Sequence, residues 1–181
     1  VYNHTAQSGQ GDTSVLDQVV PGYYHRLSLT GQVETSTCCQ NVATEHAMAE
    51  QLMADATVLW ARDYKVDGFR FDLGSILGRD QKGHMLENPP MLERIAEDPI
   101  LRNTKIIAEA WDAGGAYQVG WFPGGRWAEW NDRFRDDVRT FWRGDSGAVH
   151  HFATRLTGSS DLYLRDGRKP FHSINFLTSH D

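Results

Sequence analysis

Short apolar segments alternate with longer amphipathic ones along most of the chain. The helical stretches, such as residues 46–62, carry apolar side chains three or four positions apart, which is the spacing of one helix face. The shorter segments have the length and composition of buried strands. Strands and helices that alternate in this way predict an α/β fold with a parallel sheet and helical crossovers. We expect strands at residues 66–72, 105–109, 127–131 and 173–179, and helices at 46–62, 89–97 and about 134–142.

Residue types at the helix ends support these boundaries. Thr44 is placed to cap the first helix and Asn88 the second, because both side chains can accept a hydrogen bond from a free backbone N–H. Pro99 stops the second helix, and Gly144 follows the third, where a left-handed residue is expected. We therefore expect helices that end close to these positions.

Residues 6–43 are rich in Gly, Ser, Thr and Gln and predict a long loop region within a single domain, 1–181. Structureless loops of this length are uncommon in compact domains and often have a functional role. Cys38 and Cys39 are adjacent in sequence, so their Cα atoms are too close for an ordinary disulfide. We interpret them as loop thiols.

Composition excludes several classes of protein. The formal net charge is −6 with acids and bases interspersed, and no basic stripe suggests a nucleic-acid partner. No apolar run approaches the ~20 residues that cross a bilayer. No secretory signal is visible, and the compartment stays open. The sequence assigns no cofactor and no metal ligands, and calcium dependence stays open.

Candidate chemistry lies at the ends of the expected strands. Within 66–72, strand alternation places Arg70 and Asp72 on one face, at the carboxyl end. An arginine in this position stabilises an ionised carboxylate and fixes its rotamer. Taken alone, such a pair is more often structural than catalytic.

Two further acids end neighbouring strands in the same way. Glu109 closes 105–109, and Asp181 closes 173–179 after His180. The carboxyl ends of parallel strands form the rim where barrel enzymes carry out catalysis. Two carboxylates there, one ionised and one protonated, suit glycoside hydrolysis. His4 would share this rim and could contact a sugar hydroxyl.

These segments resemble the four signature regions of the alpha-amylase superfamily, in order. They are Val1–His4, Gly68–Asp72, Ala108–Asp112 and Thr178–Asp181. The resemblance implies a partial TIM (β/α)8 barrel, about strands 3 to 7 of the catalytic domain. It also implies that the chain is a fragment of a longer parent and is inactive alone.

The resemblance further implies a retaining mechanism. Asp72 would be the nucleophile and Glu109 the general acid and base, while Asp181 would stabilise the transition state. Arg70 would orient Asp72. The two histidines of these regions, His4 and His180, would contact the sugar at the cleavage point.

Details of the resemblance point to debranching, the hydrolysis of α-1,6-glucosidic links in pullulan, amylopectin or glycogen. Residues 14–49 look like pullulanases, and residues from Leu73 onward look like isoamylases and glycogen debranching enzymes. Trp111 resembles the aromatic that these enzymes place beside the leaving-group sugar. The alternatives are an α-1,4-acting amylase-type or branching enzyme of the same superfamily, and a non-catalytic glucan-binding module.

Overall fold

The computed structural model describes residues 1, 3–6, 14–35 and 39–180, and its centre is a parallel sheet. The sheet has four strands in the order β3-β4-β5-β6, which is also their order along the chain. All three pairings are parallel. The predicted α/β class with a parallel sheet is therefore confirmed, whereas the described residues between β4 and β5 form no helix. The strands are β3 (Gly68–Phe71), β4 (Lys105–Ala108), β5 (Ala128–Asn131) and β6 (Ser173–Asn175).

The first residue extends this sheet beyond β3. The Val1 nitrogen donates to the Arg70 carbonyl at 2.6 Å, and the Asp72 N–H donates to the Val1 carbonyl at 2.7 Å. This exchange around Phe71 is the slanted pattern of parallel pairing. A few residues later, β1 (His4–Thr5) pairs antiparallel with β2 (Gln40–Asn41) outside the parallel sheet. The N-terminal segment is thus held beside β3.

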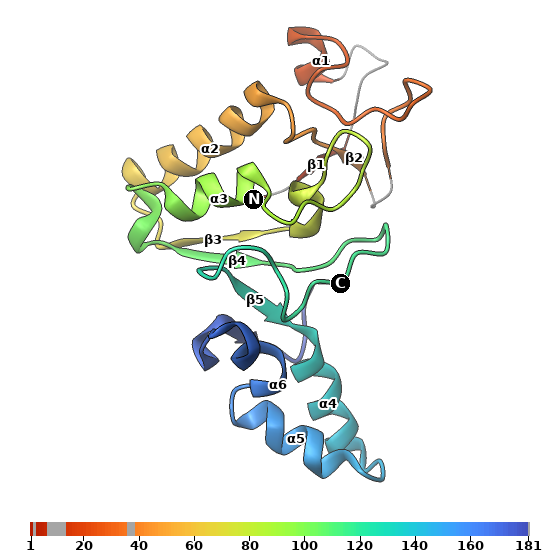
Figure 1. Ribbon diagram of the computed structural model, residues 1–181, viewed down its shortest axis with the longest axis vertical. Helices are drawn as coiled ribbons and strands as arrows, with labels where there is room; N and C mark the ends of the chain where they lie inside the picture. The colour runs from red at the N-terminus through yellow and green to blue at the C-terminus, as the bar shows by residue number, and fades with distance from the viewer. Residues whose placement is uncertain (2, 7–13, 36–38, 181) are drawn as a thin grey trace.

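Two helices cover one face of the sheet near β3 and β4 (Figure 1): α2 (Ala47–Arg62) and α3 (Pro90–Glu97). The chain passes from β3 to α3 through a 3-10 helix, Gly74–Gly78, and from α3 to β4 through a second, Leu101–Asn103. This crossover brings the end of β3 and the end of β4 to the same edge of the sheet.

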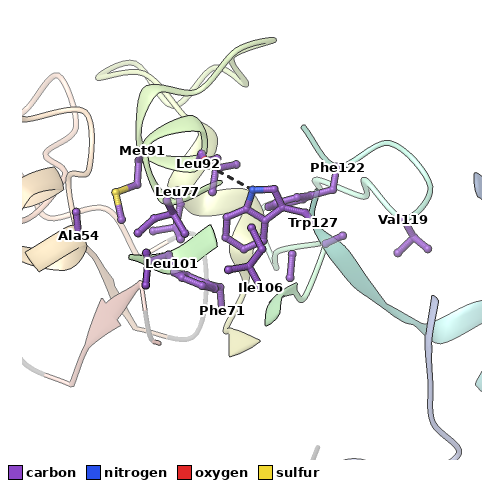
Figure 2. Packing of buried hydrophobic residues seen from close by; sticks show 13 residues of the cluster. Ala54, Phe71, Leu77, Met91, Leu92, Leu101, Ile106, Val119, Phe122 and Trp127 are labelled. Carbon is purple, nitrogen blue, oxygen red and sulfur yellow. Dashed lines mark hydrogen bonds between the residues drawn. The ribbon is translucent and has the colours of Figure 1, made fainter. Parts of the chain in front are cut away.

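The main core lies between this face and these helices. The Trp127 indole is fully buried and packs edge-on against Phe71 and Phe122 (Figure 2). Its Nε1 donates to the Leu92 carbonyl at 3.4 Å, so the polar edge of the ring is also satisfied. The buried members of this cluster are Ala54, Phe71, Leu77, Met91, Leu92, Ile95, Leu101, Ile106, Ala108, Ala110, Val119, Phe122 and Trp127.

Beyond β5 the chain forms a separate group of helices at the opposite end of the molecule (Figure 1): α4 (Asp132–Arg143), α5 (Ala148–Leu156) and α6 (Ser160–Tyr163). The Asn131 side chain caps α4 by accepting from the Phe134 N–H at 2.9 Å. Gly144 ends α4 with a φ of 85°, which confirms the predicted stop. The sequence did not reveal α5 and α6. Two 3-10 helices, Leu164–Asp166 and Pro170–His172, lead into β6.

Two predicted caps are wrong. Thr44 does not cap α2; its hydroxyl donates to the Leu77 carbonyl at 3.4 Å, and His46 occupies the N-cap position without a side-chain bond. Asn88 does not cap α3, which begins at Pro90 with Pro89 in the N-cap position. Proline at the first helical turn needs no donor there, so the side-chain cap is dispensable.

The last strand is shorter than predicted. β6 ends at Asn175, and residues 176–180 continue without regular structure. The apolar run that suggested a longer strand includes Leu177, which is 45% exposed. Its carbonyl accepts from the Arg139 guanidinium of α4, so this segment follows the helix rather than the sheet.

The region 6–43 carries one short helix, α1 (Val15–Val19), and β2 among its described residues. It is anchored by buried polar groups: His25 is fully buried and its Nδ1 lies 3.0 Å from an Asp17 carboxylate oxygen. Arg26, also buried, pairs through two nitrogens with Glu45 at 2.9 and 2.7 Å. Cys39 is partly buried, whereas Cys38 lies outside the described residues.

Candidate active site

Arg70 and Asp72 meet at the carboxyl end of β3. Arg70 Nη1 pairs with Asp72 Oδ1, and both side chains keep about a quarter of their surface exposed. Phe71, between them in sequence, faces the other way and is fully buried in the core. Strand alternation explains both facts: one face of β3 carries the ionic pair and the other carries the core aromatic.

Glu109 follows β4 and lies beside this pair. Its N–H donates to the Phe71 carbonyl at 3.0 Å, so parallel pairing continues to this residue. Glu109 Oε2 lies 3.0 Å from Arg70 Nη2, and the Leu73 N–H donates to the same oxygen at 2.7 Å. Only 3% of Glu109 is exposed. One guanidinium therefore contacts two carboxylates that are 37 positions apart in sequence.

Leu73 has an unusual backbone conformation at this point. Its φ and ψ are 40° and 50°, in the left-handed region that residues with a Cβ seldom adopt. This conformation turns the chain after Asp72 so that the Leu73 N–H faces Glu109. The next residue, Gly74, donates its N–H to the Glu109 carbonyl at 2.7 Å. Local strain of this kind gathers at functional sites.

The N-terminal segment contributes Asn3 and His4. Asn3 is fully buried, and its Nδ2 donates to the carbonyls of Asp72 and Leu73 at 2.7 and 2.5 Å. Its Oδ1 accepts from His4 Nδ1 at 2.7 Å, and this nitrogen also lies 3.7 Å from Asp72 Oδ2. An amide oxygen can only accept, so the hydrogen bond places the His4 proton on Nδ1. Asn3 thus fixes both the turn after β3 and the orientation of His4.

Trp111 lies two residues beyond Glu109 and packs, partly buried, against the hydrophobic core. It pairs with Tyr117 across a short antiparallel bridge. Asp112 fixes this loop: its Oδ2 accepts from Arg79 at 3.1 and 2.6 Å, and its Oδ1 accepts from the Ala116 N–H at 3.0 Å. The loop after Glu109 is therefore tied to the loop after β3.

His180 approaches the site through Trp130 of β5. The Arg70 guanidinium carbon lies 4.0 Å from the centroid of the Trp130 ring. The centroids of the Trp130 and His180 rings are 6.2 Å apart, and the two rings pack edge to face. Asp181, the third predicted acid, lies outside the described residues. The structure thus brings Asp72, Glu109, Arg70 and His4 into one cluster. His180 lies against the Trp130 ring, which in turn contacts Arg70.

Sequence reasoning missed three members of this cluster: Asn3, Leu73 and Trp130. A signal existed for Trp130, because it lies near the carboxyl end of the expected strand 127–131, at the edge where the candidate chemistry was placed. Asn3 stood next to His4 within a segment already singled out. The left-handed turn at Leu73 had no signal, since leucine does not favour that conformation.

Within the described residues, no three His, Cys, Asp or Glu side chains are arranged to hold a metal ion. No helix in that part of the chain is long and apolar enough to span a bilayer. The chemistry that the cluster offers is that of two carboxylates at neighbouring strand ends, joined by an arginine. Such a pair can supply a nucleophile and a proton donor on opposite sides of one bond.

Comparisons with known proteins agree on one group of relatives. No protein-family model matches the chain. Isoamylase 3 of Oryza sativa, a chloroplastic protein, is 43% identical over the whole chain, which spans 24% of that protein. A glycogen debranching enzyme of Serratia proteamaculans is 41% identical, again over the whole chain, which spans 27% of it.

Among solved structures, a pullulanase from an Anoxybacillus species, crystallised with maltotriose, superposes with a TM-score of 0.74. It is 28% identical, and the match covers 94% of this chain and 25% of the pullulanase. The chain therefore spans about a quarter of the length of each of these relatives.

Proposed function

We propose that this chain, whose homologues are isoamylases and glycogen debranching enzymes of the alpha-amylase superfamily, carries the catalytic carboxylates of an α-1,6-glucosidic debranching hydrolase. The substrates would be branched α-glucans: pullulan, amylopectin or glycogen. The observation that supports this most directly is the guanidinium of Arg70 between Asp72 and Glu109. That geometry suits the separation of about 5–5.5 Å between carboxyl groups that retaining glycosidases use.

In this mechanism Asp72 attacks the anomeric carbon while Glu109 protonates the leaving oxygen. Asp72 must be ionised for this step, and Arg70 stabilises its charge. Water then attacks the anomeric carbon, Glu109 takes up the proton of that water, and the bond between the sugar and Asp72 breaks. His4, oriented by Asn3, and His180 would contact the sugar at the cleavage point. Asp181 would stabilise the oxocarbenium-like transition state, and Trp111 would face the leaving-group sugar.

We further propose that the sheet belongs to a (β/α)8 barrel, of which this chain supplies about strands 3 to 7 within a longer protein. Val1 would lie in strand 3, and β3 to β6 would be strands 4 to 7. The parallel order of the sheet and the Val1 pairing support this assignment. A full barrel needs about 250 residues, and the chain spans only a quarter of its relatives.

An apolar groove also supports the longer barrel. It has a volume of about 660 Å³ and runs between α1, α2 and the Val1 segment. Leu52 and Trp60 of α2 line it, each with 48% of its surface exposed. Helices of a complete barrel bury such faces against neighbouring elements, so the groove marks where an earlier strand or helix would pack.

The test uses the full-length protein that we propose contains this chain. Reducing ends released from pullulan and from linear amylose would be measured for the wild type, Glu109→Gln and Asp72→Asn. We expect cleavage of pullulan and not of amylose. Loss of the general acid should lower kcat by about 10²–10⁴-fold. Asp63→Asn is the matched control, because Asp63 is an exposed acid that pairs only with Arg62 among the contacts described.

Each other outcome contradicts a different part of the proposal. Preferential cleavage of amylose would identify an α-1,4-acting enzyme. Glucan binding without turnover by the wild type would identify a binding module. Full activity of Glu109→Gln would show that the catalytic roles are wrong.

A further inference from the structure

Trp130 presents the flat face of its indole to Arg70. The guanidinium carbon stands 4.0 Å from the ring centroid, within the range of a cation–π contact. Trp130 comes from β5, two strands away from β3 in the sheet. Its neighbour Glu129 is fully buried on the other side of the strand, where backbone N–H groups and Arg168 hold it. The buried anchoring of Glu129 fixes the side from which the indole approaches.

Arg70 needs such a neighbour because its charged contacts hold only one edge of the guanidinium. Nη1 pairs with Asp72, and Nη2 lies 3.0 Å from Glu109. Nε is buried and makes no hydrogen bond with any described residue. Contacts through Nη1 and Nη2 alone still allow the guanidinium plane to tilt about the line between these two nitrogens. A ring that lies against the face of the guanidinium opposes this tilt. The indole therefore covers the part of the guanidinium that the carboxylates do not reach.

We propose that Trp130 is a positioning residue, which holds Arg70 in the plane where it contacts both carboxylates. The inference rests on the proposed glycosidase function of Asp72 and Glu109. Trp130 acts through Arg70 and does not touch the reacting atoms. The centroid of its ring also lies 5.1 Å from that of Phe176 and 6.2 Å from that of His180. The same indole therefore links the last described segment to the carboxylate cluster.

A positioning role and a sugar-stacking role predict different kinetics. If Trp130 holds Arg70, its loss misplaces groups that act in the transition state, so kcat falls while KM changes little. If the indole instead stacks on a sugar ring, its loss weakens substrate binding, and KM rises with kcat unchanged. The contact with Arg70 favours the first behaviour, because the guanidinium covers one face of the indole and the rings of Phe176 and His180 also lie against it.

The experiment compares Trp130→Leu with Trp130→Phe in the full-length enzyme, with pullulan as substrate. Trp130→Leu keeps apolar bulk but has no π face, and we expect kcat to fall about 2- to 30-fold with KM changed less than about twofold. Trp130→Phe restores a π face and should recover most of kcat. Phe176→Leu is the matched control: it removes another ring neighbour of Trp130 and should leave kcat within about twofold.

A double-mutant cycle tests the path through Arg70. Arg70→Lys combined with Trp130→Leu should lose less activity than the product of the two single losses, because both changes remove the same contact. Additive losses would overturn the inference, as would an unchanged kcat in Trp130→Leu or no recovery in Trp130→Phe. A wild-type enzyme that does not cleave pullulan would contradict the proposed function instead, and the two failures are therefore distinguishable.

Discussion

Arg70 Nη2 lies 3.0 Å from Glu109 Oε2, while Nη1 of the same guanidinium pairs with Asp72. This double contact requires the planar, forked arrangement of donors that arginine has and lysine lacks. In Arg70→Lys the single ammonium can approach only one carboxylate closely. We expect kcat of the full-length enzyme on pullulan to fall on the order of 100-fold, as for other small displacements of reacting groups.

Arg143→Lys serves as the control for this substitution. Arg143 pairs with Asp145 on the surface at the end of α4, and 67% of its side chain is exposed. Its replacement should leave kcat unchanged. Equal activities of Arg70→Lys and the wild type would show that the bridge between the carboxylates has no catalytic role.

The sequence allows local parts of this site to be predicted because strand alternation is a local property. It places Arg70 and Asp72 on one face and Phe71 on the other without reference to the rest of the chain. The contact of Asn3 with the Asp72 carbonyl joins residues 69 positions apart. No local pattern specifies which buried amide meets which carbonyl at that separation.

The fold shows the same limit. α4 is recognisable from its apolar spacing and its terminal glycine, whereas α6 has only four residues and begins after Ser159, a left-handed residue. The helix α5 carries no side-chain cap, so its start lacks a sequence signal. The length of β6 depends on Arg139 of α4, which binds the segment after the strand, and tertiary contacts of this kind override a local apolar pattern.

Glu129 and Arg168 form an ion pair inside the protein, with 0% and 2% of their side chains exposed. Glu129 also accepts from the N–H groups of Gly120 and Phe122. Glu129→Gln removes the charge that balances Arg168 and turns an amide donor toward groups that are donors themselves. We expect the free energy of unfolding of the full-length protein to fall by about 3–5 kcal/mol in urea titrations.

Asp166→Asn provides the matched control for that pair. Asp166 accepts from Nε of the same Arg168 at 2.9 Å, but 48% of its side chain is exposed. Its replacement should cost less than about 1 kcal/mol, because water screens the pair. Similar losses in the two variants would mean that burial does not determine the strength of these contacts.

Gly68 permits the close approach of β3 and β4. A Cβ at this position would stand 2.7 Å from both the Cβ and the carbonyl oxygen of Lys105, its partner in the sheet. The strands would have to separate, which should cost about 1–3 kcal/mol in Gly68→Ala. Because Asp72 and Glu109 follow these two strands, activity on pullulan should fall as well.

Gly125→Ala shows whether this loss is specific to the strand contact. A Cβ at Gly125 has no atom within 4 Å, and its φ is not in the left-handed region. The free energy of unfolding should therefore change by less than about 0.5 kcal/mol. Unaltered stability of Gly68→Ala would mean that the two strands tolerate a wider spacing.

Tyr117 should make stability depend on alkaline pH. Partial burial, together with its hydrogen bond to Asp132 at 2.8 Å, raises the pKa of Tyr117 from 10.0 to about 12. Between these values the unfolded chain releases the phenol proton while the folded protein retains it. Stability from this group is thus complete below pH 10 and is lost as the pH rises toward 12.

Urea midpoints measured from pH 9 upward should fall more steeply for the wild type than for Tyr117→Phe, which retains the ring and cannot ionise. Asp132→Asn removes the anionic acceptor, so it should lower the pKa of Tyr117 and flatten the wild-type profile in part. Parallel profiles for the wild type and Tyr117→Phe would show that the phenol is not held by this contact.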